Sequence, residues 1–188
     1  KDNGYKKYET SYFNTKKHGE ETFWYEGGEK WWVCSYVNDK LHGLSTSWYK
    51  NGQKKMEGKW VDGLLEGLRV GFYEDGQKKF EEYWVNGKRN GRWVMWTKNR
   101  EEREVGVFIN GSGSFIDWYD DGQKKLEGKY KDEEKDGLVI EFYENGNTRE
   151  VSNFTLGKRN GDFVSWYKNG KKEGFWTFKD NLLEGLST

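Results

Sequence analysis

The chain repeats itself with a period of 24 residues. Eight boundary glycines mark the repeats, and six of the seven intervals between them have this length. The fourth interval has 22 residues, and we expect the loss to fall in the loop at Asn110-Gly111-Ser112. A fixed period in this range is typical of stacked repeat proteins, because a single repeat cannot bury its own apolar face. The boundary glycines are Gly19, Gly43, Gly67, Gly91, Gly113, Gly137, Gly161 and Gly185.

The repeats extend over the whole sequence, with no linker or low-complexity tract between them. We therefore expect a single repeat domain over residues 1–188. A half repeat, 1–18, with its own turn at Asn3-Gly4, precedes the first boundary glycine, and a partial repeat, 185–188, begins at the last. The complete repeats are 19–42, 43–66, 67–90, 91–112, 113–136, 137–160 and 161–184.

The middle of each repeat carries a dipeptide that favours a tight turn, such as Asn51-Gly52 or Asp75-Gly76. Glycine adopts the positive φ angle that a hairpin turn needs without a clash at Cβ. We expect Lys50-Asn51-Gly52 and its equivalents to form type I turns with a glycine bulge. Arg100 replaces this glycine in repeat 91–112, which predicts a different or strained turn there.

The composition indicates strands rather than helices. The chain contains no Ala and no Pro, and aromatic residues make up 18% of it. Ala is the best helix former, whereas Tyr, Trp and Val favour strands. We therefore predict an all-β fold: an elongated, twisted, single antiparallel meander sheet of stacked β-hairpin repeats, curling into an open groove or half-pipe.

The alternation of apolar residues predicts which side chains share a face. In repeat 67–90, Val70 and Phe72 stand in the first strand, and Phe80 and Trp84 stand in the second. A three-residue turn would bring these four onto one inner face, where we expect them to form the core. Trp118 has the position of Phe72, so we expect it to be an inner residue as well.

The predicted outer face carries the candidate binding residues. A column of tyrosines recurs there, and it fits either a Tyr, Lys and Glu ladder that keeps the face soluble or a binding surface. At the second position after the boundary glycine, three repeats add a ring that the repeat pattern does not require, and Trp31 stands where other repeats have Lys. The candidate partner contacts are Trp93, Phe115, Phe163, Tyr49, Tyr73, Tyr119, Tyr143 and Trp31.

The sequence shows no sign of catalytic, cofactor or metal chemistry. His18 and His42 lack ligand partners at metal spacing, and the glycines have hairpin spacing rather than that of a phosphate-binding loop. Cys34 stands at a small-residue position, where we expect a buried, inert thiol. We expect no enzyme and no cofactor. The formal net charge is zero, which argues against nucleic acid as the partner and leaves an anionic membrane as a secondary alternative.

The segment from Trp48 to Gly67 has the pattern W-Y-x-N-G-Q-K-K-x-E-G-x-W-x-x-G-x-x-x-G. This pattern resembles the MORN-repeat family, and most closely the bacterial variant that includes the YwqK-like antitoxin proteins. The resemblance covers essentially the whole chain and implies β-hairpins that stack into an elongated, twisted sheet. It also implies non-enzymatic binding, which in the family includes protein scaffolding, dimerisation, membrane association and toxin neutralisation. The repeats with Arg100 and with Trp31-Trp32 depart from the pattern.

These observations favour a protein-binding repeat scaffold, of an antitoxin or immunity type or acting at a host or cell surface. The partner is expected to be a protein, with self-association possible in principle. An envelope-associated module that binds glycan or lipid is the alternative, because aromatic ladders suit sugar stacking. The sequence begins at Lys1 rather than Met, so we expect that an upstream segment was removed. This leaves an exported or cell-envelope location open alongside a cytoplasmic one.

Overall fold

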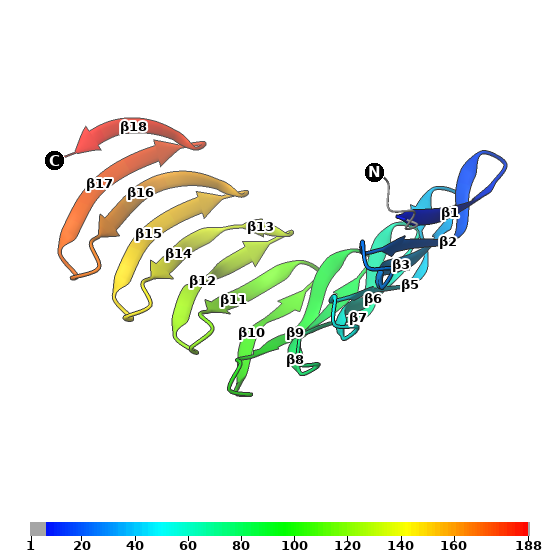
Figure 1. Cartoon of the computed structure of the whole chain (residues 1–188). Coiled ribbons are helices and arrows are strands. Elements are labelled where there is room, and N and C mark those ends of the chain that lie inside the picture. The colour runs from blue at the N-terminus through cyan, green and yellow to red at the C-terminus, as the bar shows by residue number, and fades with distance from the viewer. Residues whose placement is uncertain (1–6, 188) are drawn as a thin grey trace, which may run out of the picture. The chain divides into compact units, whose positions relative to one another are not determined.

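The computed structural model describes residues 7–187, and within this range every regular element is a β-strand. The chain divides into two compact units, residues 1–88 and 89–188, which we call the N-terminal half and the C-terminal half. In each half, strands that follow one another in the sequence pair antiparallel and form an open meander with turns at alternate edges (Figure 1). The prediction of an all-β antiparallel meander of hairpins is confirmed. The turn predicted at Asn3-Gly4 lies outside the described residues.

The strands have the following bounds. Those of the N-terminal half are β1 (Tyr8–Phe13), β2 (Lys16–Trp24), β3 (Lys30–Val37), β4 (Lys40–Leu41), β5 (Gly43–Trp48), β6 (Lys54–Val61), β7 (Leu64–Phe72) and β8 (Lys78–Val85). The next strand, β9 (Lys88–Trp96), opens the C-terminal half. The others are β10 (Glu102–Ile109), β11 (Ser112–Trp118), β12 (Lys124–Lys131), β13 (Glu134–Lys135), β14 (Gly137–Phe142), β15 (Thr148–Thr155), β16 (Lys158–Trp166), β17 (Lys172–Lys179) and β18 (Leu182–Ser187).

The turn inside each repeat has the predicted form. The Gly52 N–H donates to the Tyr49 carbonyl at 3.0 Å, and the Tyr49 N–H donates to the Gln53 carbonyl at 2.9 Å. Gly52 has a φ of 81°, which completes a type I turn with a glycine bulge. The Arg100 turn keeps the same two hydrogen bonds and places Arg100 at a φ of 67°. The turn is therefore of the same kind, and the prediction of a different or strained turn is confirmed by the positive φ of Arg100.

The connections between repeats are tight two-residue turns. Val61 pairs with Leu64 across Asp62 and Gly63, which have φ angles of 50° and 85°. Positive φ at both central residues defines a type I′ turn, whose twist matches that of the flanking strands. The equivalent pairs with positive φ are Asn14-Thr15, Asn38-Asp39, Asn86-Gly87, Asn110-Gly111, Asp132-Glu133, Leu156-Gly157 and Asp180-Asn181.

The short repeat, 91–112, has lost a bulge rather than part of a turn. Where repeat 43–66 joins the next one, the pairing of β6 with β7 shifts by two residues at Gly67, which has a φ of 79°. In the short repeat, Phe108 pairs with Gly113 and Gly106 with Phe115 without a shift. The prediction that the loss falls in the loop at Asn110-Gly111-Ser112 is therefore wrong. The tight turn needs both of its central residues, whereas removing two bulge residues leaves the alternation of faces unchanged.

A second bulge reverses the predicted arrangement of faces. Trp48 pairs with Lys54, but Ser47 pairs with Met56, so that Lys55 is an extra residue without a cross-strand partner. One extra residue turns every following side chain of the strand to the other face. The predicted common face of the two strands is therefore wrong, although the turn that joins them was predicted correctly.

The pairing defines two faces, which we name by their contents. The groove face carries the second and fourth residues after each boundary glycine and the residues paired with them. The ladder face carries the third and fifth residues and their partners. In repeat 43–66, the groove face has Ser45, Ser47, Met56, Gly58 and Trp60, and the ladder face has Thr46, Trp48 and Glu57. Val70 and Phe72 lie on the ladder face, whereas Phe80 and Trp84 lie on the groove face.

The described residues form a single layer in each half, so few large side chains are fully buried. The buried apolar residues of the N-terminal half are Cys34 and Leu65. Those of the C-terminal half are Trp93, Val94, Phe108, Phe115 and Val139. Cys34 is 0% exposed, and burial raises the pKa of its thiol to about 11, which confirms the predicted buried thiol. The groove face is therefore better filled in the C-terminal half than in the N-terminal half.

Candidate functional site

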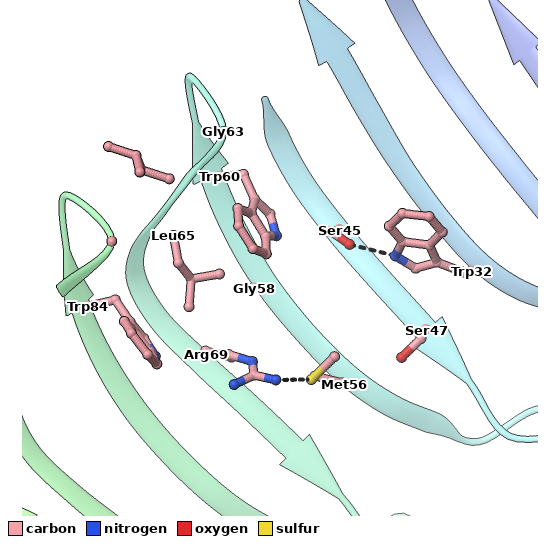
Figure 2. Close-up of a pocket in the computed structure, with 12 residues that line it drawn as sticks. Trp32, Ser45, Ser47, Met56, Gly58, Trp60, Gly63, Leu65, Arg69 and Trp84 are labelled. Carbon is pink, nitrogen blue, oxygen red and sulfur yellow. Dashed lines mark hydrogen bonds between the residues drawn. The ribbon is translucent and has the colours of Figure 1, made fainter. Parts of the chain in front are cut away.

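The groove face of the N-terminal half is hollowed by an aromatic groove with a volume of about 450 Å³ (Figure 2). Three indole rings, those of Trp32, Trp60 and Trp84, contribute to its lining. Between Trp60 and Trp84 lies Leu65, which is 7% exposed and forms part of the floor (Figure 2). A concave, mostly apolar site with a few polar groups is the usual form of a binding site.

Small residues keep this groove open. Ser45 pairs with Gly58 across strands β5 and β6, so neither side chain fills the space between the rings. The indole N–H of Trp32 donates to the Ser45 hydroxyl at 2.8 Å, which holds that ring at one side of the groove. The groove is therefore open because the two repeat positions of Ser45 and Gly58 carry small residues.

The groove holds one cation, and that cation is already paired. The Arg69 guanidinium donates to the Glu82 carboxylate at 2.8 Å and to the Met56 sulfur at 2.8 Å. It also lies 5.4 Å from the centroid of the Phe80 ring. Since Arg69 and Glu82 neutralise each other, the lining presents apolar and hydrogen-bonding groups rather than a net charge.

The aromatic surface continues beyond the groove on the same half. Trp32 stacks on Phe23 with ring centroids 5.3 Å apart, and Phe23 contacts Tyr8 of the neighbouring strand at 6.0 Å. Trp31 packs edge-on against Phe23 at 5.6 Å and is 42% exposed. Of the predicted partner contacts, Trp31 is therefore an exposed ring beside the groove. It occupies the bulge position that Lys55 has in the next repeat.

The same face of the C-terminal half is filled. Trp93, Phe108 and Phe115 are 7%, 1% and 6% exposed, respectively. The Arg89 guanidinium lies 4.2 Å from the centroid of the Tyr130 ring and 5.3 Å from that of Trp93. Arg89 also donates to the Glu133 carboxylate at 2.6 Å. These residues form a packed cluster of rings around a paired cation, which fills the groove face at this place.

The placement of Trp93, Phe115 and Phe163 on an outer face, away from the second-strand apolar residues, is therefore wrong. The bulge turns those second-strand residues to the groove face, where Trp93, Phe115 and Phe163 stand and pair with Gly106, Gly128 and Trp176. Phe163 is half-buried, at 5.3 Å from the Trp176 ring and 5.0 Å from the Arg159 guanidinium. A role for these three residues in partner contact stays a prediction, with Phe163 the most accessible of them.

Comparison with protein families decides the kind of repeat. The profile of the MORN repeat variant matches residues 41–62, 65–86 and 135–155. These three segments are MORN-variant repeats. A search of curated proteins finds no match. Two of the three matched segments, 41–62 and 65–86, supply most of the groove lining, and MORN repeats are generally associated with binding rather than catalysis.

The tyrosine column has a structural role. The hydroxyls of Tyr49, Tyr119 and Tyr143 donate to carbonyl oxygens of the next repeat, at Phe72, Phe142 and Trp166, over 2.8, 2.7 and 2.8 Å. Burial raises the pKa of the Tyr49 and Tyr119 hydroxyls. Lys79 lies over the Tyr73 ring at 5.4 Å, as Lys55 does over Tyr49 at 5.6 Å.

The extra residue of the bulge thus positions a cation on the tyrosine ring. This arrangement supports the ladder interpretation, and partner contact through Tyr49, Tyr73, Tyr119 and Tyr143 stays a prediction.

The groove residues themselves were missed as a site. The sequence analysis assigned Trp84 to the core and gave no role to Arg69. The signal was present in the second position after the boundary glycine, where Ser45 and Arg69 stand instead of a ring. Reading that signal needs the correct register, which depends on the bulge at Lys55.

The described residues offer no centre for metal chemistry, since no group of three or more His, Cys, Asp or Glu side chains converges among them. No helix long and apolar enough to cross a membrane occurs in the same part of the chain. The buried Glu21 carboxylate is 3% exposed and bonded to Lys17 and Thr10, both at 2.7 Å. Burial alone would raise the pKa of Glu21, but these hydrogen bonds outweigh it and hold the pKa below its usual value.

Proposed function

We propose that the protein is a non-enzymatic scaffold that binds a segment of another protein in the groove of the N-terminal half. One observation carries the proposal: three tryptophans line an open groove of about 450 Å³ on a face that is packed with rings in the other half. Tryptophan is among the residues that contribute most to binding energy at protein interfaces. A neutral, aromatic lining suits a partner that buries apolar side chains there.

The family suggests finer versions of this function. An antitoxin or immunity protein would use the groove to grip a toxin and occlude its active site, and a surface protein would use it to hold a host or cell-surface partner. Trp31, exposed beside the groove, would extend the contact area in either case. The identity of the protein captured in the experiment below distinguishes these versions.

A glycan is the second candidate ligand, because a surface of indole rings also suits stacking on the apolar faces of sugars. Retention on a polysaccharide resin that depends on Trp60 and Trp84 would favour it. Retention on liposomes would favour lipid instead.

Photo-crosslinking tests the proposed function. Leu64 lines the groove and is 48% exposed, so a benzoylphenylalanine in its place should capture a bound partner. Leu182 has the same repeat position in the C-terminal half, is 72% exposed, and serves as the matched control. We expect a protein adduct from Leu64 that is absent from Leu182 and is lost in Trp84→Ala. Equal adducts at both positions, or an adduct that Trp84→Ala leaves unchanged, would contradict the proposal.

A further inference from the structure

Every complete repeat carries an aromatic ring near the end of its second strand, and Trp60 is the ring of repeat 43–66. Trp60 pairs with its boundary glycine, Gly43, and Phe154 pairs with Gly137 in the same way. We call this set of rings the ring column. Its members are Tyr36, Trp60, Trp84, Phe108, Tyr130, Phe154 and Phe178.

Most rings of the column have a cation of the same chain over them. The cation stands two residues before the boundary glycine of the repeat. The Lys17 Nζ lies 4.8 Å from the centroid of the Tyr36 ring, and the Lys135 Nζ lies 5.3 Å from that of Phe154. The other examples are Arg89 at 6.0 Å from Phe108, Arg159 at 5.9 Å from Phe178, and Arg89 at 4.2 Å from Tyr130.

At the groove, the position that supplies the cation carries leucine. Leu41 and Leu65 occupy it in the repeats of Trp60 and Trp84. Among residues 7–187, no lysine or arginine lies over the Trp60 ring. The chain thus places an indole, the ring that attracts cations best, in a repeat that does not supply the cation itself.

The carboxylate that accompanies such a cation is replaced as well. Lys17 donates to Glu21 at 2.7 Å, and Glu21 has the repeat position of Ser45. Figure 2 shows Trp60 and Trp32 on either side of Ser45. The place that an ion pair fills in the preceding repeat is therefore part of the groove, between two indole rings.

An arginine side chain fits this place. Its planar guanidinium stacks on aromatic rings and is less strongly hydrated than an ammonium group. Its N–H groups can donate to the hydroxyl oxygens of Ser45 and Ser47, and its methylene stem can pack on Met56. Arg159 shows within this chain that one guanidinium can contact several rings, at 5.0, 5.9 and 6.0 Å.

An acidic side chain fits poorly, because the face of an aromatic ring is the negative end of its quadrupole. The cation already in the groove does not exclude an arginine, since Arg69 is bonded to Glu82 at 2.8 Å and its charge is offset.

We infer that the groove binds a segment of the partner protein through an arginine, whose guanidinium stacks on Trp60. The arginine takes the place that the chain's own cations have on other rings of the column. This inference rests on the proposed function and names the side chain that the groove recognises.

Titration followed by NMR tests the inference with the whole chain, because the indole N–H signals of Trp32 and Trp60 report on the site directly. The probe is the tripeptide acetyl-Gly-Arg-Gly-amide. The control peptides carry citrulline, the uncharged isostere of arginine, or leucine at the centre. We expect the arginine peptide to shift both signals and to bind about fivefold more tightly than either control.

A pair of variants tests whether the site is the vacant place of the repeat. Leu41→Lys gives Trp60 the cation that Tyr36 receives from Lys17, and we expect it to weaken binding of the arginine peptide about tenfold. Leu41→Met is the uncharged control of similar size and should leave binding unchanged. The indole signals show in the same spectra that both variants are folded.

The outcomes separate the two proposals. Equal binding of the arginine, citrulline and leucine peptides, or no binding of the arginine peptide, would overturn the inference. Wild-type binding by a folded Leu41→Lys chain would overturn it as well. If a protein is still captured from Leu64 in a Trp84-dependent way in these cases, the scaffold stands and only the arginine is rejected.

Discussion

The two halves share one repeat but use its second position differently. In the C-terminal half, Phe115 stands there, is 6% exposed, and packs over Gly128, its partner across the strands. In the N-terminal half, Ser45 stands there and pairs with Gly58, so the glycine has no ring above it. The first arrangement gives a packed cluster and the second gives a groove.

This difference indicates that some positions of the repeat maintain the fold, whereas the second position decides whether a groove is available for binding. The turns, the bulge at the Lys55 position and the tyrosine hydrogen bonds recur in both halves and hold the hairpins together. The second position of the repeat can carry different side chains, because the strands pair through their backbones whichever side chain stands there. A ring there fills the face, and a small residue there opens it.

The largest loss of stability should come from removing a ring from the packed groove face of the C-terminal half. Phe108→Ala removes a ring that is 1% exposed, and we expect a loss of about 3–5 kcal/mol in the free energy of unfolding. Trp60→Ala, at the same repeat position but half-buried beside the groove, should cost about 1–2 kcal/mol. Urea denaturation of both variants measures the contrast. Equal losses would mean that the groove is packed as tightly as the cluster.

A smaller contrast comes from the paired glycines. A methyl group at Gly128 would lie 3.0 Å from both the Phe115 ring and Val139, so we expect Gly128→Ala to cost about 1–3 kcal/mol. At Gly58 the nearest atoms are 3.4 Å and 3.5 Å away, on the side chains of Arg69 and Leu65, so Gly58→Ala should cost less than about 1 kcal/mol. Thermal denaturation of the two variants decides between tight and open packing. A larger loss for Gly58→Ala would contradict the comparison.

In repeat 19–42 the second position after the boundary glycine carries Glu21, whose carboxylate is buried. Its carboxylate has a lowered pKa in the folded protein, so the stability it contributes is complete above its usual pKa of 4.5 and is lost as the pH falls through the folded value. We expect the stability of the wild-type chain to decline on acidification in that range. In Glu21→Gln this part of the decline should disappear, and an unchanged acid profile would show that Glu21 contributes nothing to it.

The smallest effect concerns the turn of repeat 91–112. Arg100 has a φ of 67°, where the other repeats place glycine. Arg100→Gly should therefore raise stability by about 0.5–1 kcal/mol, because it removes strain at a cost in unfolded-state entropy. The reverse change, Gly122→Arg in repeat 113–136, should lower stability by a similar amount. Equilibrium denaturation that moves both variants in the same direction would exclude backbone strain as the cause.

The sequence predicted the architecture because its strongest signals are local. Glycine at the turn and the absence of alanine are read from neighbouring residues, and they led to hairpins with type I turns and a glycine bulge. The position of Cys34 in a column of small residues likewise predicted its burial. These features follow from backbone sterics and from side-chain volume, which a single repeat already displays.

The faces could not be predicted because they depend on one unpaired residue. Lys55 looks like any other polar strand residue, yet its lack of a cross-strand partner moves Met56, Gly58 and Trp60 to the opposite face. For this reason the sequence analysis placed Trp118, rather than Trp93, on the same face as the apolar residues of the second strand. The groove was missed for the same reason, since its lining joins residues that had been assigned to different faces.

The measurement that tests the account most directly is partner capture by Ser45→Phe. This change gives the N-terminal half the second-position ring of the C-terminal half, and Ser45→Ala is the control that leaves the groove open. We expect Ser45→Phe to fold with stability within about 1 kcal/mol of the wild type and to lose photo-crosslinking from Leu64, while Ser45→Ala retains it. Full crosslinking from a folded Ser45→Phe chain would show that the groove is not the binding site.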